Sequence, residues 1–262
     1  MKEGIIKNLN NFIHEETIFS VCLNANGTKT PLICLHSGDG DALNYRFVAK
    51  YLKDRPVYAY QYKQKEADMY PFESIEEMVK SYLQELNHIG PVHILGDCLG
   101  GGIAYEFANQ WIESGKKVCM LMLLDTPRKG IKKVKYSFLN RILLKGSRNI
   151  KMILQNPLNI VNEVKRVYFK MLDWLKYRKN PNHFRHRIYD IYRKYQPKPY
   201  PQSIIYVQAN REIEEGNASY WKKQSNVFKW IGMDCKHGEF LSAKNSMKLV
   251  ELMEKEMNAY ET

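Results

Sequence analysis

Short apolar segments that alternate with helix-like segments are the feature that most constrains the fold of this chain. Residues 118–124 are all apolar, as expected for a strand that is buried on both faces of a parallel sheet. Just before this run, Ile103, Phe107 and Trp111 recur at helical spacing. The alternation predicts an α/β fold with a mostly parallel sheet that is flanked by helices on both faces.

The expected elements can be placed along the chain from apolar runs, helical spacing and turn residues. Strands are expected at residues 31–35, 57–60, 92–95, 118–124, 203–208 and 227–232, and helices at about residues 44–52, 74–88, 101–112 and 246–257. Residues 128–200 interrupt this order, with helical periodicity around residues 150–178 and 184–195. We therefore expect a single domain over residues 1–262, with an inserted basic helical lid at residues 128–200.

The length and composition favour one soluble domain. A chain of 262 residues can bury one sizeable core, and 44% hydrophobic with 26% charged residues is ordinary for a globular protein. The apolar run at residues 118–124 is too short to cross a membrane, and the first residues lack the apolar stretch of a signal peptide. We expect no membrane association and a cytoplasmic location. The chain begins with Met and ends soon after the last expected helix, which suggests a free-standing protein.

The five cysteines predict neither a disulfide framework nor a metal site. Their number is odd, several lie in strand-like apolar runs, and no two are at CxxC spacing. Cys235 and His237 lie close in sequence but have no second pair to complete a ligand set. We therefore expect no metal.

The net charge of +12 comes from one part of the chain. Residues 128–200 contain 20 Lys or Arg against 3 Asp or Glu, so the remainder has 20 against 25, a net charge of −5. No recognised nucleic-acid motif accompanies the basic residues, so we expect no nucleic-acid partner. Two interpretations stay open: a surface that attracts an acidic partner, or a solvated helical face.

A glycine-flanked cysteine lies where the strand at residues 92–95 turns into a helix. In the stretch GDCLG, Cys98 has Gly96 and Gly100 two residues away on either side, which is the pattern of a nucleophile elbow. A Cβ at either glycine would strike the adjoining strand or helix. The start of the helix favours a thiolate at Cys98, whereas the carboxylate of Asp97 opposes it. The alternative is a buried structural cysteine beside a glycine turn.

An acid and a histidine follow Cys98 in the order that α/β-hydrolases use. Asp125 directly ends the strand at residues 118–124, at the sheet edge where active sites collect. His237 follows the last strand and precedes the last helix, where the general base is expected. Asp125 could instead cap a helix or turn, and His237 could be a surface loop residue. Other acidic residues that could replace Asp125 are Glu212, Glu214, Glu215 and Asp234.

Two backbone amides are candidates for an oxyanion hole. The amide of Leu99 follows the nucleophile, and Gly38 lies in a glycine-rich turn after the strand at residues 31–35. His36 precedes this turn, and its position before Cys98 in the chain suits loop shaping better than base catalysis.

The segments together resemble the thioesterases of nonribosomal peptide and polyketide assembly lines, over roughly residues 30–127 and 203–257. The resemblance is carried by PLICLH at residues 31–36, SIEEM at 74–78, LGDCLGG at 95–101, LLDT at 123–126 and HGEFL at 237–241. It implies an α/β-hydrolase fold with a triad of Cys98, His237 and Asp125. It also implies that the lid shapes the acyl pocket and receives the phosphopantetheine arm of an acyl or peptidyl carrier protein, so that the enzyme needs no cofactor of its own.

The chain departs from the family at two positions. Cys98 replaces the usual serine, and Asp97 replaces a residue that is commonly aromatic or His. An acyl group on Cys98 would remain a thioester, which amines attack readily, so the substitution favours aminolysis, cyclisation or transfer over plain hydrolysis. Two alternatives remain: an amide-forming or other acyltransferase that uses thioesters, and a silent hydrolase fold that binds carrier proteins through its lid.

Overall fold

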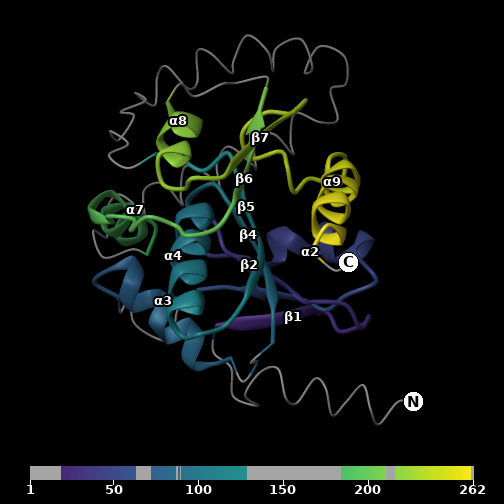
Figure 1. Ribbon diagram of the computed structural model, residues 1–262, viewed down its shortest axis with the longest axis horizontal. Helices are drawn as coiled ribbons and strands as arrows, with labels where there is room; N and C mark the ends of the chain where they lie inside the picture. The colour runs from purple at the N-terminus through teal and green to yellow at the C-terminus, as the bar shows by residue number, and fades with distance from the viewer. Residues whose placement is uncertain are drawn as a thin grey trace, which may run out of the picture.

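The computed structural model describes residues 19–62, 72–86, 88, 90–128, 184–210 and 216–260, and in this part of the chain a seven-stranded sheet forms the centre (Figure 1). The strands are β1 (Ser20–Asn24), β2 (Leu32–Leu35), β3 (Val57–Tyr60), β4 (Val92–Asp97), β5 (Val118–Leu124), β6 (Ile204–Ala209) and β7 (Phe228–Met233). Their order across the sheet is β1-β3-β2-β4-β5-β6-β7. β1 runs antiparallel to β3 and the other pairs are parallel, so the expectation of a mostly parallel sheet is confirmed.

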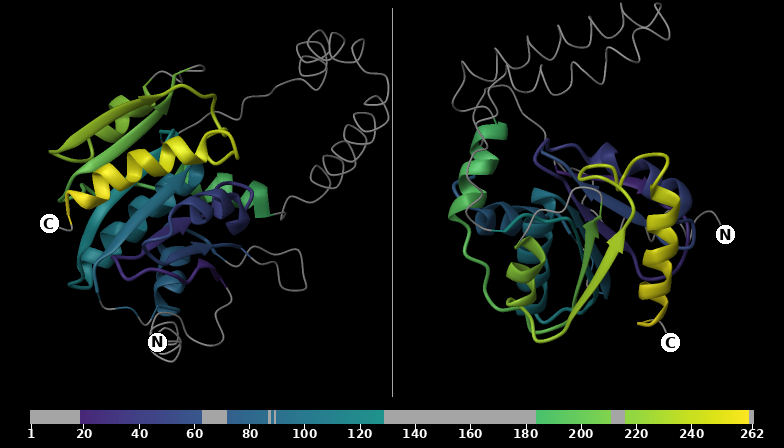
Figure 2. Two further views of the ribbon diagram at one scale, coloured as in Figure 1. Left: turned by 90° about the vertical axis from the view of Figure 1, so that its right-hand side faces the viewer. Right: turned by 90° about the horizontal axis from the view of Figure 1, so that it is seen from above.

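Helices cover both faces of the sheet, as Figures 1 and 2 show. One face packs against α3 (Ile75–Gln84), α4 (Leu99–Glu113), α7 (Phe184–Lys194) and α8 (Asn217–Lys222). The other face packs against the 3-10 helix η1 (Ala42–Tyr45), α2 (Arg46–Tyr51) and α9 (Ser246–Asn258). Each face has its own hydrophobic core.

The central strands are buried on both faces, which explains their unbroken apolar sequences. In β5, Leu121 and Leu123 belong to the core under α3 and α4, whereas Met120, Met122 and Leu124 belong to the core under α2 and α9. Successive side chains of a strand point to opposite faces, so a strand with helices on both sides needs apolar residues throughout.

The observed helices differ from the expected ranges in several details. The helix expected at residues 74–88 is α3, which ends at Gln84, and the helix expected at residues 44–52 consists of η1 and α2. At the start of α3, the Ser74 hydroxyl accepts a hydrogen bond from the Glu77 amide at 3.1 Å. The Glu77 carboxylate accepts from the Glu73 amide at 2.8 Å, one residue before the position that a standard capping box uses. β1 and α8 were not predicted.

Most of the expected lid, residues 129–183, lies outside the described residues. Its C-terminal part is α7, which packs against α4. Tyr192 of α7 packs so closely on Gly102 of α4 that a Cβ at this glycine would overlap the tyrosine ring. The Tyr195 hydroxyl donates to the buried Glu106 carboxylate at 2.7 Å. Among the described helices, none is long and apolar enough to span a membrane.

Candidate active site

Cys98 lies in the sharp turn between β4 and α4. Its backbone has φ 53° and ψ −126°, a conformation that is strained for a residue with a side chain. Hydrogen bonds hold the turn on both sides: the Cys98 amide donates to the Leu124 carbonyl at 2.9 Å, and the Gly101 amide donates to the Cys98 carbonyl at 3.0 Å. Strained residues that the surrounding structure holds in place are often functional, and this one carries a thiol at the carboxyl edge of the sheet.

The glycines around Cys98 are required by close contacts between backbones. A Cβ on Gly96 would overlap the Gly100 carbonyl, and a Cβ on Gly100 would overlap the carbonyls of Leu35 and His36. β4, α4 and the end of β2 therefore meet with no room for side chains at these positions. This is the geometry that the glycine spacing in the sequence predicted for a nucleophile elbow.

Asp125 and His237 come together beside this turn although 112 residues separate them. The Nδ1 atom of His237 lies 2.8 Å from Oδ2 of Asp125. Asp125 is buried directly after β5, and its amide donates to the Val207 carbonyl at 2.7 Å. The carboxylate fixes the Nδ1–H tautomer, so that Nε2 is left to face the Cys98 thiol, which hydrogen-bonds the same imidazole.

Hydrogen bonds make the His237 imidazole a stronger base, whereas burial makes the Cys98 thiol a weaker acid. Its hydrogen bonds with the accepting Asp125 carboxylate and with Cys98 raise the pKa of His237 to about 11. Burial raises the pKa of the Cys98 thiol, although hydrogen bonds from His237 and from the Leu99 amide act in the opposite direction. In this arrangement His237 can accept the proton of the partly buried thiol, and Asp125 can stabilise the imidazolium that would result.

The two expected oxyanion donors lie on adjoining segments. The Leu99 amide points at the Cys98 sulfur. Gly38 packs against the Leu99 side chain, where a Cβ would lie 3.0 Å from Leu99 Cδ1, and also against the Tyr189 ring of α7. The structure thus brings Gly38 next to the side chain of Leu99, the residue that follows Cys98.

His36 is buried next to this site but has a different role in the structure. Its Nδ1 donates to the Ser37 carbonyl at 2.8 Å, which leaves Nε2 to accept from the Tyr82 hydroxyl at 2.7 Å. Burial lowers the pKa of His36. Both ring nitrogens are thus engaged in holding the loop of Gly38 against α3.

Of the rival acids, Asp234 is described and is not the carboxylate that bonds His237 Nδ1. Glu212, Glu214 and Glu215 lie outside the described residues.

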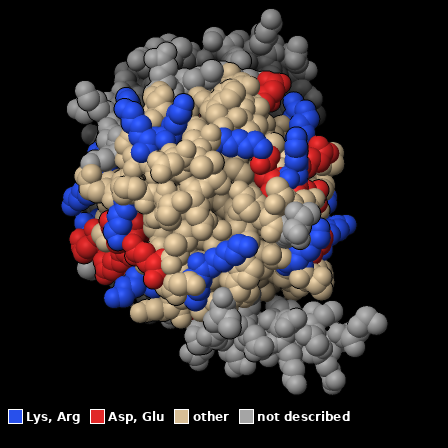
Figure 3. All heavy atoms as spheres, viewed as in Figure 1, with Lys and Arg blue, Asp and Glu red and all other residues tan. Residues whose placement is uncertain are grey.

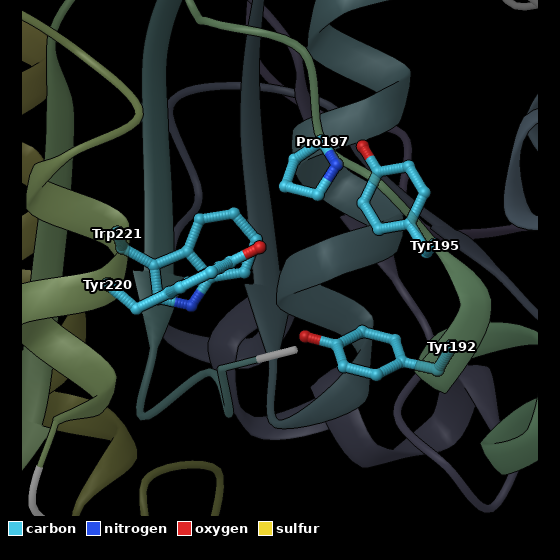
Figure 4. A pocket seen from close by; sticks show the side chains of 5 residues that line it. All are labelled: Tyr192, Tyr195, Pro197, Tyr220 and Trp221. Atoms are coloured by element: carbon cyan, nitrogen blue, oxygen red, sulfur yellow. The ribbon is translucent and has the colours of Figure 1, made fainter. Parts of the chain in front are cut away.

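Two features of the site were not predicted from the sequence. One is a shallow aromatic depression (Figure 4), lined by Tyr192, Tyr195, Pro197, Tyr220 and Trp221. It adjoins the loop after β5, because the Trp221 indole donates to the Thr126 carbonyl at 3.0 Å and the Tyr192 hydroxyl to the Pro127 carbonyl at 2.7 Å. The other is the burial of Asp97, which is only 7% exposed. Helical spacing over residues 184–195 predicted the helix that carries Tyr192, whereas α8, which carries Tyr220 and Trp221, was not predicted.

A model of the thioesterase domain family matches residues 30–256. The chain belongs to this family. Among curated proteins, this thioesterase domain is 38% identical over 110 residues to aspulvinone E synthetase melA of Aspergillus terreus, a match that covers 41% of this chain and 12% of that protein. It is 32% identical over 119 residues to malpibaldin synthetase of Mortierella alpina, covering 43% of this chain and 2% of that protein. The chain thus matches only a small part of these relatives.

Solved thioesterase structures share the fold. A four-domain nonribosomal peptide synthetase, holo-AB3403, superposes with a TM-score of 0.66 and 20% identity over 97% of this chain and 21% of that one. The NocB thioesterase domain, in a covalent complex with a fluorophosphonate nocardicin G analog, gives a TM-score of 0.64 and 15% identity over 91% and 99% of the two chains. The expected α/β-hydrolase fold is therefore confirmed.

Proposed function

We propose that this thioesterase domain takes an acyl or peptidyl chain from a carrier-protein thioester onto Cys98 and releases it by hydrolysis, aminolysis or cyclisation. The proposal rests on one observation above all. A single imidazole, that of His237, bonds the Asp125 carboxylate at 2.8 Å on one side and the Cys98 thiol in a nucleophile elbow on the other.

The geometry supports the following steps. The Cys98 sulfur attacks the thioester carbonyl while His237 takes the thiol proton and passes it to the departing thiol of the carrier. The amides of Leu99 and Gly38 stabilise the oxyanion that forms. The chain then rests on Cys98 as a thioester until an acceptor attacks, with His237 again moving the proton.

Two observations support a carrier protein as the partner: the names of the curated relatives and the distribution of charge along the chain. Several curated relatives are named as nonribosomal peptide synthetases. On the face in Figure 3, Lys and Arg are interspersed with Asp and Glu, so the described surface has no broad basic area on this side. The basic excess instead lies in residues 129–183, with 14 Lys or Arg against 2 Asp or Glu. We propose that this segment attracts an acidic carrier and the phosphate of its phosphopantetheine arm.

Intact mass measurement after incubation with acyl-loaded carrier protein tests the proposal. The wild-type protein should gain the mass of the acyl group, and Cys98→Ala should not. Cys22→Ala is the matched control, because Cys22 is an exposed thiol on β1 and its removal should leave the adduct in place. An adduct that persists on Cys98→Ala would assign the nucleophile elsewhere, and a wild-type protein that never gains mass would favour the silent carrier-binding alternative.

A further inference from the structure

Asp97 is a buried carboxyl group beside the nucleophile that the steps above do not use. It is the last residue of β4, directly before Cys98, and is 7% exposed. Its amide hydrogen-bonds the Tyr45 hydroxyl at 3.1 Å, which fixes the backbone of the residue. Among the described residues, no donor reaches its Oδ1 atom.

The position of Asp97 in the strand places its carboxyl near the imidazole. Side chains alternate along β4, and Leu95 belongs to the core under α2 and α9. Asp97 therefore points to the same face of the sheet, where the loop between β7 and α9 carries His237. The charges of His237, Asp39 and Asp125 act on Asp97, so these three groups lie near it.

The arrangement concentrates negative charge around the reacting sulfur. Asp125 is bonded through Oδ2 to His237, and its Oδ1, like Oδ1 of Asp97, is buried with no donor among the described residues. Burying a carboxylate without hydrogen bonds is costly, so a group that donates hydrogen bonds or carries positive charge would be stabilised here. Burial, with the nearby carboxylates of Asp39 and Asp125, raises the pKa of Asp97 to about 7, although His237 lowers it. A carboxylate with this pKa can both accept and release a proton at neutral pH.

We propose that the Asp97 carboxylate binds the ammonium group of an amine acceptor and takes one proton from it, so that the acyl chain leaves Cys98 as an amide. This inference rests on the proposed transfer of the acyl chain to Cys98. The ammonium loses one proton to Asp97 and becomes a nucleophilic amine, whose nitrogen attacks the thioester carbonyl. His237 takes a second proton from the nitrogen and gives it to the Cys98 sulfur as the carbon–sulfur bond breaks. The products are the amide, the free thiol and the proton held on Asp97, which returns to solvent.

Two nucleophiles distinguish this role from a structural one. Butylamine is protonated at neutral pH and needs a base before it can attack, whereas hydroxylamine is largely uncharged and does not. With the acyl-enzyme formed first, Asp97→Asn should lower butylamide formation about 100-fold and leave hydroxamate formation near the wild-type rate. Asp41→Asn is the matched control, since Asp41 is an exposed cap of η1, and it should keep the wild-type yields of both products.

The possible results separate this inference from the proposed function. Equal losses with both nucleophiles would make Asp97 a positioning residue and overturn the ammonium role. A wild-type acyl-enzyme that gives only free acid with every amine would also overturn it, while acyl transfer to Cys98 would stand. No acyl-enzyme at all would refute the proposed function itself, and this inference with it.

A second measurement on the wild-type protein applies if Asp97→Asn does not fold. Butyltrimethylammonium has the charge of the acceptor but cannot attack, so it should inhibit butylamide formation competitively. An uncharged alcohol of the same shape should not inhibit. Equal inhibition by both compounds would mean that shape alone is recognised, which would contradict a carboxylate that binds the ammonium group.

Discussion

The imidazole of His237 receives its orientation from a residue on a distant strand. Asp125 lies at the end of β5 in the centre of the sheet, whereas His237 is in a loop beyond the edge strand β7. The hydrogen bond between them determines which ring nitrogen carries a hydrogen, and therefore whether Nε2 can accept the Cys98 proton. In the proposed reaction, the Asp125 carboxylate would thus act on the thiol through the imidazole.

Replacement of Asp125 by asparagine tests this dependence. An amide in place of the carboxylate can neither stabilise the imidazolium nor enforce the tautomer, so turnover of an acyl thioester should fall about 100-fold or more. Steady-state kinetics on the purified variants measures the effect, with Asp234→Asn expected to stay near the wild-type rate. A collapse in Asp234→Asn together with normal turnover in Asp125→Asn would transfer the orienting role to Asp234.

Asp97 should make the folded protein less stable as the pH rises. Burial raises its pKa from the ordinary value of 3.8 to about 7, so between these values the folded state binds a proton that the unfolded state has released. Wild-type stability is then lost progressively from about pH 4 to pH 7. Asp97→Asn removes this titration. As the pH rises across this interval, the free energy of unfolding of the variant, measured relative to that of the wild type, should therefore increase by up to about 4 kcal/mol. Urea unfolding at pH 4.5 and pH 8 measures it, and an unchanged difference between the two proteins would disprove the raised pKa.

At the scale of elements, the crossing of β4, β2 and α4 fixes the position of Cys98. Gly96 and Gly100 allow the strand and helix backbones to meet, and Tyr192 of α7 packs on Gly102, two residues further along α4. The turn at Cys98 is therefore held by β2 and β4 on one side and by α7 on the other. A side chain added at Gly96 or Gly100 would overlap backbone atoms, so whole elements would have to shift to make room for it.

Gly100→Ala should show this constraint directly. The new Cβ would overlap the carbonyls of Leu35 and His36, and the resulting strain should lower the free energy of unfolding by about 3 kcal/mol. Gly115→Ala is a useful comparison, because Gly115 has φ 79° but open space around it, and only the backbone penalty of about 1 kcal/mol applies. Denaturant unfolding compares the two variants. Equal losses of unfolding free energy in the two variants would show that the backbones at the crossing shift apart at little cost.

At the scale of the whole molecule, opposite charges occupy different segments. Residues 128–200 have 20 Lys or Arg against 3 Asp or Glu, and the rest of the chain is net acidic. Within the described residues, the carboxylate of Asp97 acts on the Cys98 thiol, and the carboxylate of Asp125 bonds His237. A basic segment that attracts an acidic carrier would thus deliver its substrate to an acidic reaction centre.

Added salt should distinguish the docking of the carrier protein from the chemical steps at Cys98. Exposed charges are screened beyond about 8 Å at physiological ionic strength, so added salt should lower kcat/KM for a carrier-bound thioester. A short uncharged thioester mimic should be much less affected, because it reaches Cys98 without contact with the basic segment. Parallel salt titrations of the two substrates measure the difference, and identical sensitivity would argue against electrostatic docking.

The sequence predicted those parts of the molecule that local patterns encode. Largely apolar runs marked the strands β2 to β6, β7 was predicted although Lys229 interrupts its run, and glycine spacing marked the turn at Cys98. Chain order pointed to Asp125 and His237, which the structure brings together. β1 was missed because a half-exposed antiparallel edge strand lacks the continuous apolar run. The burial of Asp97 could not be predicted, because it depends on η1 and the loop of His237, which come from distant segments.

Backbone angles at the site have a consequence for protein engineering. Within the described residues, Cys98 and Asp125 are the non-glycine residues with positive φ, at 53° and 42°. Glycine adopts such angles without strain, so Cys98→Gly and Asp125→Gly relieve a local penalty while removing the thiol and the carboxylate. If Cys98 and Asp125 act as proposed, a library that is screened for heat resistance alone would therefore enrich inactive variants at these two positions. Improvement of this enzyme requires that each round of selection score product formation alongside melting temperature.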